Sequence, residues 1–161
     1  GGSGNLLVYE KIIKKIVKLK KSNFKIIIIV GPFAKNYEAV CLAFKKFKNI
    51  KILYQPKSIL STLIGTKVFI SSAGVSTFES SFLKIPTLLF KMNNNQNLLD
   101  SDYEKLGHYF SLEKTDLNHS DKIVNLIILM LKNRIQIKKM MSKSTLNIKS
   151  IKKNYQKLMK F

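Results

Sequence analysis

One stretch decides the fold of this 161-residue chain: Val68-Phe69-Ile70-Ser71-Ser72-Ala73-Gly74-Val75-Ser76-Thr77-Phe78-Glu79-Ser80. Its apolar, β-branched start predicts a buried strand. The chain then passes through Ser72, Ala73 and Gly74 into a segment with helical spacing, and such small residues let a ligand approach the backbone closely. The N–H groups and the dipole at the start of a helix favour a phosphate. The stretch therefore predicts a strand–turn–helix unit with a phosphate site at its turn.

Glu79 adds a carboxylate to this unit and is the only acidic residue between Glu38 and Asp100. A carboxylate in this position can accept two ribose hydroxyls, as the acidic residue of a dinucleotide-binding fold does. Ser76 and Thr77 supply hydroxyl donors. The alternative is a Ser/Thr-capped helix in which Glu79 belongs to a capping box.

The composition is that of a globular domain, with 45% hydrophobic residues. No uninterrupted apolar run reaches the roughly 18 residues of a membrane span, and we expect no signal peptide. The single cysteine, Cys41, excludes an internal disulfide and a cysteine metal cluster and is interpreted as a packing residue. We expect a cytoplasmic protein.

A formal net charge of +20 suggests contact with nucleic acid or an anionic membrane. Only Arg134 is an arginine, so the bidentate groups that read bases are nearly absent and specific nucleic-acid binding is disfavoured. Residues 122–161 contain basic residues and no acidic one. We expect helices packed on the domain there; an amphipathic patch on the inner face of the membrane is the alternative.

Strands and helices alternate at short spacing along the chain. Strands are expected at 24–30, 50–54, 68–71, 86–90 and 109–112, and helices at 6–19, 36–48, 58–64, 76–83 and 121–131. A polar loop at 93–97 is expected to open a further helix that runs to Leu106. Asn5 is the expected N-cap of the first helix and Ser58 that of the third. The pattern predicts an α/β, Rossmann-like parallel sheet with helices on both faces, formed by residues 1–120 and covered by C-terminal helices within 121–161. Ligands of such sheets bind beyond the carboxyl ends of the strands.

Catalytic groups are scarce in this sequence. His108 and His119 lack the neighbours of a zinc site, and His108 is expected to face solvent. Neither a G-x-S-x-G elbow nor a Walker loop occurs. Three acidic residues, Asp100, Asp102 and Glu104, are interpreted as the acidic half of a helix. No catalytic residue, metal or cofactor is assigned.

Three patterns follow one another along the chain, the first within the stretch already described: Ser72-Ala73-Gly74-Val75-Ser76-Thr77-Phe78-Glu79, Leu83-Lys84-Ile85-Pro86-Thr87 and Asn95-Gln96-Asn97. Together they resemble the C-terminal domain of GT-B nucleotide-sugar enzymes, which is similar to glycosyltransferase family 28. The likeness is greatest to the UDP-sugar hydrolase of pseudaminic acid biosynthesis and its relatives in spore-coat polysaccharide synthesis. The family pattern is roughly S-x-G-G-S-T-x-x-E, a helix, G-x-P and then N-Q. This chain has Ala73-Gly74-Val75 where the family often has two adjacent glycines, and Lys84 in place of the glycine before Ile85-Pro86.

The resemblance covers residues 1–110. It implies that Glu79 binds the ribose hydroxyls and that the turn from Ser72 to Thr77 holds the diphosphate. Backbone near Leu53 and Tyr54 would meet the uracil, and the 95–97 segment would approach the sugar or the phosphates. The nucleotide-sugar site implied in this way comprises Gly2, Ser3, Gly31, Leu53, Tyr54, Ser72, Ala73, Gly74, Val75, Ser76, Thr77, Glu79, Asn95, Gln96 and Asn97.

Residues 1–5, Gly-Gly-Ser-Gly-Asn, are similar to a loop that follows a strand in this family; a cloning linker is the alternative. The catalytic histidine of the family belongs to an N-terminal domain, and nothing in this chain corresponds to it. The chain is therefore expected to be the UDP-sugar-binding half of a hydrolase or glycosyltransferase. A separate N-terminal-type domain or a second copy of the chain is an expected partner. The alternative is a non-catalytic module that docks on an anionic membrane or partner.

Overall fold

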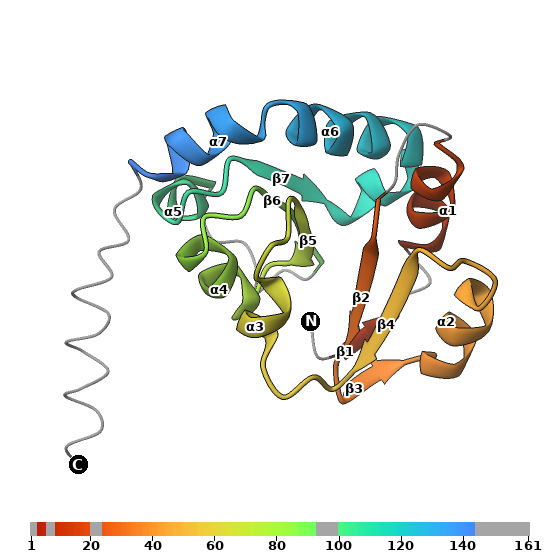
Figure 1. Ribbon diagram of the computed structural model, residues 1–161. Helices are drawn as coiled ribbons and strands as arrows, with labels where there is room; N and C mark the ends of the chain where they lie inside the picture. Colours follow the sequence, from red (N-terminus) through yellow and green to blue (C-terminus); the bar gives the residue numbers. More distant parts are fainter. Residues whose placement is uncertain (1–2, 6–8, 20–23, 93–99, 144–161) are drawn as a thin grey trace, which may run out of the picture.

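A computed structural model describes residues 3–5, 9–19, 24–92 and 100–143 (Figure 1). The strands are β1 (Ser3–Asn5), β2 (Ile26–Val30), β3 (Phe33–Lys35), β4 (Ile50–Tyr54), β5 (Phe69–Ser72), β6 (Thr87–Lys91) and β7 (Phe110–Glu113). The helices are α1 (Glu10–Lys18), α2 (Tyr37–Phe44), α3 (Ile59–Leu63), α4 (Ser76–Phe82), α5 (Asp100–Lys105), the 3₁₀ helix η3 (Lys114–Asn118), α6 (Ser120–Lys132) and α7 (Arg134–Met141). The predicted α/β class is confirmed.

The strands form three small sheets within the described residues, and every pairing is parallel: β1–β3, β2–β4 and β5–β6–β7. Val30 lies opposite Tyr54 at the carboxyl end of one sheet, and Ser72 lies opposite Phe90 near that of another. The predicted parallel pairing is confirmed, and in the described residues it is divided among separate sheets because β2 and β5 are not paired with each other.

The larger core lies between the β5–β6–β7 sheet and the helices α1 and α6. Ile12, Phe90 and Ile123 are almost fully buried there. An ion pair between Lys15 Nζ and Asp121 Oδ2, 2.6 Å apart, lies at the same helix contact. Figure 1 shows α6 and α7 running across the top of β7. Buried side chains of α6 and α7, as far as Met141, belong to this core; residues 144–161 lie outside the described part.

A smaller core joins β2 and β4 to α2 and is built around Ile28, Val30, Val40 and Phe44. A strand inside a parallel sheet is usually buried on both faces. Ile27, which points away from this core, is nevertheless 46% exposed. In the described residues, the second face of β2 is only partly covered.

Several element boundaries differ from the prediction. Asn5 is the last residue of β1, so it does not cap α1, whose N-cap is Tyr9. Helix α2 ends at Phe44, four residues before the expected end. The predicted cap of α3 is confirmed, since Ser61 N donates to Ser58 Oγ at 3.2 Å.

Candidate functional site

The predicted phosphate turn connects β5 to α4 at the carboxyl end of the strand. Ala73 N donates to the carbonyl of Phe90 on β6 at 3.2 Å, which anchors the start of the turn. Thr77 N and Phe78 N donate to the carbonyls of Gly74 and Val75, each at 3.0 Å. Among the described residues, these bonds leave the N–H groups at positions 74–76 without a partner, so they are free to meet a ligand.

Hydroxyl groups hold the shape of this turn. Ser71 Oγ lies 2.9 Å from Ser76 Oγ, and it donates to the carbonyl of Ser72 at 2.8 Å. Thr77 is buried, and its Oγ1 donates to the carbonyl of Gly74 at 2.6 Å. Thr77 therefore closes the turn in this structure, whereas the half-buried Ser76 lies nearer to solvent.

The outer surface of the turn is open. Gly74 is exposed, and a Cβ atom built on it would meet no heavy atom within 4 Å. Val75 is exposed as well, while Ala73 packs against Leu89 and Tyr103 beneath the turn. A phosphate oxygen can therefore approach the backbone at Gly74 without displacing a side chain.

Glu79 lies one turn into α4, and its Oε2 is buried with no hydrogen-bond partner in the described residues. Within the described residues no side chain caps α4, so the capping-box interpretation of Glu79 finds no support. A buried carboxylate oxygen without a partner is destabilising, and a hydroxyl donor from a ligand would relieve that penalty. Helix α4 has only seven residues, so its dipole contributes little and Glu79 is the stronger feature.

A second group of predicted residues lies at the end of the β2–β4 sheet. Tyr54 is 48% exposed, and its ring stacks on that of Tyr37 with centroids 4.5 Å apart. A hydrogen bond to the side chain of Cys41 raises the pKa of Tyr37. Gly31 follows β2, and its carbonyl accepts a bond from Ala34 N at 3.2 Å. These residues offer an exposed aromatic face at a carboxyl edge.

The structure thus gathers residues 72–79 in one place and puts Gly31, Leu53 and Tyr54 at the carboxyl end of another sheet. Ser3 lies in β1 opposite Phe33, just beyond the end of β2. Gly2, Asn95, Gln96 and Asn97 lie outside the described residues.

Two residues that the sequence did not assign to the site lie close to it. Lys91 ends β6 at the same carboxyl edge, and its Nζ lies 3.4 Å from Glu113 Oε1. Its position directly after an apolar strand was the one signal that could have identified it. The other is Tyr37, whose ring pairs with Tyr54 across the start of α2.

His108 corrects a further prediction, because it is buried and does not face solvent. Its Nε2 lies 2.8 Å from the carbonyl of Thr77, and since a carbonyl only accepts, Nε2 carries the proton. Burial lowers the pKa of His108, and the bond to Thr77 opposes that shift. The ring supports α4 from behind and has no access to a ligand at the turn.

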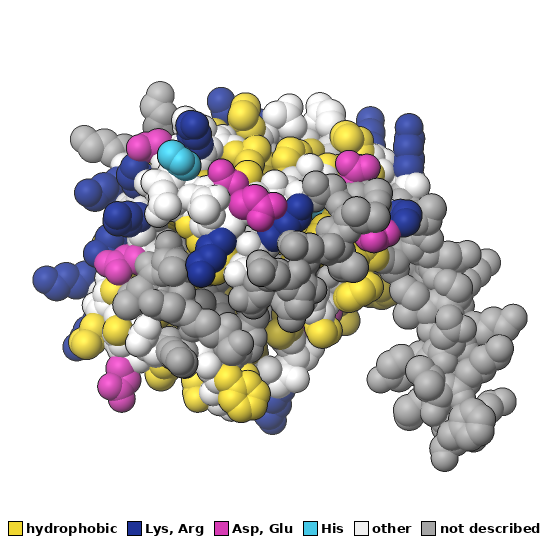
Figure 2. Space-filling view, turned by 180° about the vertical axis from the view of Figure 1, so that it is seen from behind, with side chains coloured by type: hydrophobic (Ala, Val, Ile, Leu, Met, Phe, Trp, Pro, Cys, Tyr) yellow, Lys and Arg dark blue, Asp and Glu magenta, His cyan; other side chains and the backbone are white. Residues whose placement is uncertain are grey.

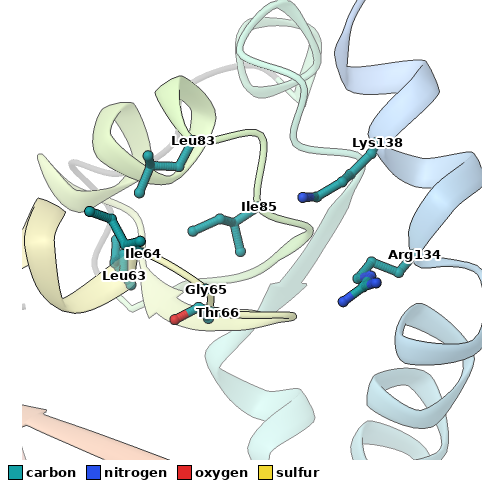
Figure 3. A pocket seen from close by; sticks show the side chains of 8 residues that line it. All are labelled: Leu63, Ile64, Gly65, Thr66, Leu83, Ile85, Arg134 and Lys138. Atoms are coloured by element: carbon teal, nitrogen blue, oxygen red, sulfur yellow. The ribbon is translucent and has the colours of Figure 1, made fainter.

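A hollow of the described surface lies away from this turn. It measures about 250 Å³ and lies near the amino ends of β5 and β6, away from the predicted site. Figure 3 shows Arg134 and Lys138 on α7, on the side of the hollow opposite Leu63 and Ile64. Its lining consists of Leu63, Ile64, Gly65, Thr66, Leu83, Ile85, Arg134 and Lys138. Ligands of parallel sheets bind at the opposite ends of the strands, so we do not place the nucleotide there.

Charged side chains are mixed on the surface. Figure 2 shows basic groups spread over one face with acidic groups between them, not gathered in a single stripe. Among the described residues, no group of His, Cys, Asp and Glu is arranged to hold a metal ion. In the same part of the chain, no helix has the length and apolarity needed to cross a membrane.

Comparisons with protein-family models, with curated proteins and with solved structures find no match to this chain.

Proposed function

We propose that this domain binds a nucleoside diphosphate sugar, with UDP as its nucleotide, at the turn between β5 and α4. The observation that carries the proposal is the buried Oε2 of Glu79, one turn beyond a loop with several N–H groups; none of these groups has a hydrogen-bond partner in the part of the chain that the structure describes. A ribose supplies hydroxyl donors for the carboxylate, and a diphosphate supplies acceptors for the N–H groups.

The three parts of the ligand would contact different parts of the edge. The diphosphate would lie over the exposed backbone at Gly74, where no side chain blocks its approach. The ribose would meet Glu79. The base would extend toward the Tyr37–Tyr54 pair at the end of the neighbouring sheet, where an exposed ring can stack on it.

The reaction served by such a domain would be hydrolysis of a UDP-sugar or transfer of the sugar to an acceptor, in the synthesis of surface polysaccharide or a nonulosonic acid. The described residues hold no exposed acid–base pair at the turn, since His108 is buried behind α4. The catalytic base would come from a partner domain, and this domain would supply nucleotide binding.

Glu79→Gln tests the assignment because the amide keeps the shape of the side chain and removes its charge. Hydrogen bonds to a charged group are worth roughly 1.5–3 kcal/mol, so UDP affinity should fall about 10- to 100-fold. The same loss should appear when 2′,3′-dideoxy-UDP is titrated into the unmodified chain, and the two losses should not add. Glu104→Gln is the control, since Glu104 is an exposed acid on α5. Equal UDP affinity of the Glu79→Gln and unmodified chains would remove Glu79 from the site.

A second candidate function is peripheral docking on an anionic membrane. One observation favours it: Ile135 and Met140 of α7 are 63% and 49% exposed, beside the cations Arg134, Lys138 and Lys139. Exposed apolar side chains among lysines are typical of a helix that lies in the lipid interface.

A further inference from the structure

The hollow near the amino ends of β5 and β6 has an apolar side and a cationic side (Figure 3). Leu63 and Ile85, both buried, contribute aliphatic surface, and the exposed Ile64 extends that surface toward the rim. Arg134 and Lys138 of α7 line the opposite side. A volume of about 250 Å³ thus lies between hydrocarbon and positive charge.

Helix α7 holds the two cations of the hollow in place. Arg134 and Lys138 are four residues apart, so they share one face of the helix. Ile137 and Met141 of the same helix are buried in the larger core, which fixes the orientation of α7. The core thus sets the position from which both cations reach the hollow.

The loop after α4, which supplies part of the apolar side, is tied to α7. Lys84 Nζ donates to Ser142 Oγ at 3.2 Å, and Ser142 Oγ donates to the carbonyl of Lys138 at 2.9 Å. Lys84 has a φ of +51°, a left-handed conformation that is uncommon outside glycine. The chain adopts this conformation next to Ile85, where the apolar side of the hollow is joined to the cationic side.

The positive charge of the hollow is not neutralised within the described residues. The ion pairs found there involve other lysines, and Arg134 and Lys138 have no acidic partner among them. Two like charges four residues apart on a helix repel each other. Arg134 is also half-buried, so its charge is partly removed from water. An anion bound between the two side chains would offset both penalties.

Arg134 is the only arginine in a chain with 29 basic residues. Its planar guanidinium can donate two parallel hydrogen bonds to one carboxylate or phosphate, whereas a lysine ammonium acts as a point charge. The one side chain suited to such bidentate recognition therefore lines a hollow whose other side is apolar. Thr66 adds a hydroxyl group to the same lining.

We propose that this hollow binds a small organic anion that carries one carboxylate or phosphate group on an apolar body. Arg134 and Lys138 hold the charged group, and Leu63 and Ile85 contact the apolar body. A cavity of roughly 150 Å³ can hold benzene, so a hollow of about 250 Å³ has room for a ring of that size and a charged group. The site lies at the opposite end of the strands from the β5–α4 turn, and the inference is independent of nucleotide binding.

A nuclear magnetic resonance titration of the isotopically labelled chain tests the proposal with four probes. Phenyl phosphate and benzoate carry both features of the ligand, benzyl alcohol lacks the charge, and inorganic phosphate lacks the apolar body. At least one of the first two should shift the amide signals of Thr66, Ile85 and Lys138. It should bind at least about 10-fold more tightly than benzyl alcohol or inorganic phosphate. Binding of benzoate alone would identify a carboxylate ligand, and binding of phenyl phosphate alone would identify a phosphate ester.

Three results of this titration would overturn the proposal. The first is the absence of shifts at the hollow with every probe. The second is a set of shifts confined to Gly74, which would place the probe at the nucleotide turn. The third is equal affinity for inorganic phosphate and the better of the two aromatic anions, because the apolar side would then contribute nothing.

Substitutions on α7 test the role of the two cations. Arg134→Gln should weaken binding of the better probe at least about 10-fold, because it removes the bidentate group. Lys138→Gln should weaken binding too, and it alters only an exposed side chain. Lys139→Gln is the matched control, since it removes the same charge from the same helix at a position that does not line the hollow. Equal losses in all three variants would indicate general attraction to a basic surface and overturn the proposal.

Vesicles that contain phosphatidate distinguish two sources of such an anion. If they displace the bound probe from the hollow, the ligand is a lipid headgroup; if the probe stays bound, the ligand is a soluble compound. Ile135→Ser should leave binding of the soluble probes unchanged, because Ile135 does not line the hollow.

Discussion

His108 Nε2 lies 2.8 Å from the carbonyl oxygen of Thr77. This hydrogen bond joins the segment before β7 to the first turn of α4. The bond spans 31 positions of sequence and passes behind the candidate phosphate turn. It requires a proton on Nε2, while Nδ1 is buried without a partner in the described residues.

Stability should therefore fall as the pH drops below the unfolded-state pKa of histidine, about 6.5. Burial lowers the pKa of His108 in the folded state, so at acidic pH the unfolded chain binds a proton that the folded chain excludes. Each unit of separation between the two pKa values is worth about 1.4 kcal/mol. Urea unfolding at pH about 7.5 and 5.5 measures the loss.

His108→Gln should remove most of this difference between the two pH values, because its amide does not titrate. His119→Gln is the control, since His119 is exposed at the start of α6. An unchanged pH dependence in His108→Gln would show that another group is responsible.

Gly107→Ala should destabilise the domain more than Gly65→Ala. Both glycines have positive φ, +83° and +82°, and alanine in that region costs about 1–2 kcal/mol. A Cβ at position 107 would also lie 3.2 Å from Met141 Cβ, whereas one at position 65 would meet nothing. Thermal unfolding of the two variants should separate them, and equal melting temperatures would contradict the close packing of α7 on Gly107.

Gly74→Ala should leave stability within about 0.5 kcal/mol and weaken UDP binding. The new Cβ meets no atom of the protein, yet it occupies the open surface through which the diphosphate would approach. Parallel melting and titration experiments measure the two effects. A variant with unchanged UDP affinity would mean that the phosphates lie elsewhere.

If α7 docks on an anionic membrane, the chain should sediment with vesicles of mixed phosphatidylserine and phosphatidylcholine. It should not sediment with vesicles of pure phosphatidylcholine. Binding should weaken as the salt concentration is raised from about 0.05 to 0.5 M, because salt screens the attraction between the lysines and the anionic lipids. Ile135→Ser should reduce binding by removing an exposed apolar side chain. Salt-insensitive or absent binding would eliminate the membrane interpretation.

Local patterns predicted much of the fold. β4 has the predicted bounds, and Ser58 caps α3 as expected, because both depend on neighbouring residues. Asn5 shows the limit of that reasoning: it is a favourable cap residue, but pairing of β1 with β3 places it in a strand. The apolar run of β2 predicted a strand, but the exposure of Ile27 shows that one face of this strand is incompletely covered.

The candidate site was predictable in part. The spacing from Ser72 to Glu79 identified a turn with a carboxylate, but the missing partner of Glu79 Oε2 is visible only in three dimensions. Burial of His108 could not be inferred from its Gly-His-Tyr context, because a distant helix produces it. The same holds for the Tyr37–Tyr54 stack, which joins residues of two different elements.

Calorimetric titration of UDP, UMP and ADP into the purified chain tests the central claim most directly. We predict a UDP dissociation constant of about 1 mM or tighter, at least about 10-fold weaker binding of UMP because the second phosphate is missing, and weaker binding of ADP. Equal affinities for UDP and UMP, or no heat with any of the three nucleotides, would contradict nucleoside-diphosphate binding at the β5–α4 turn.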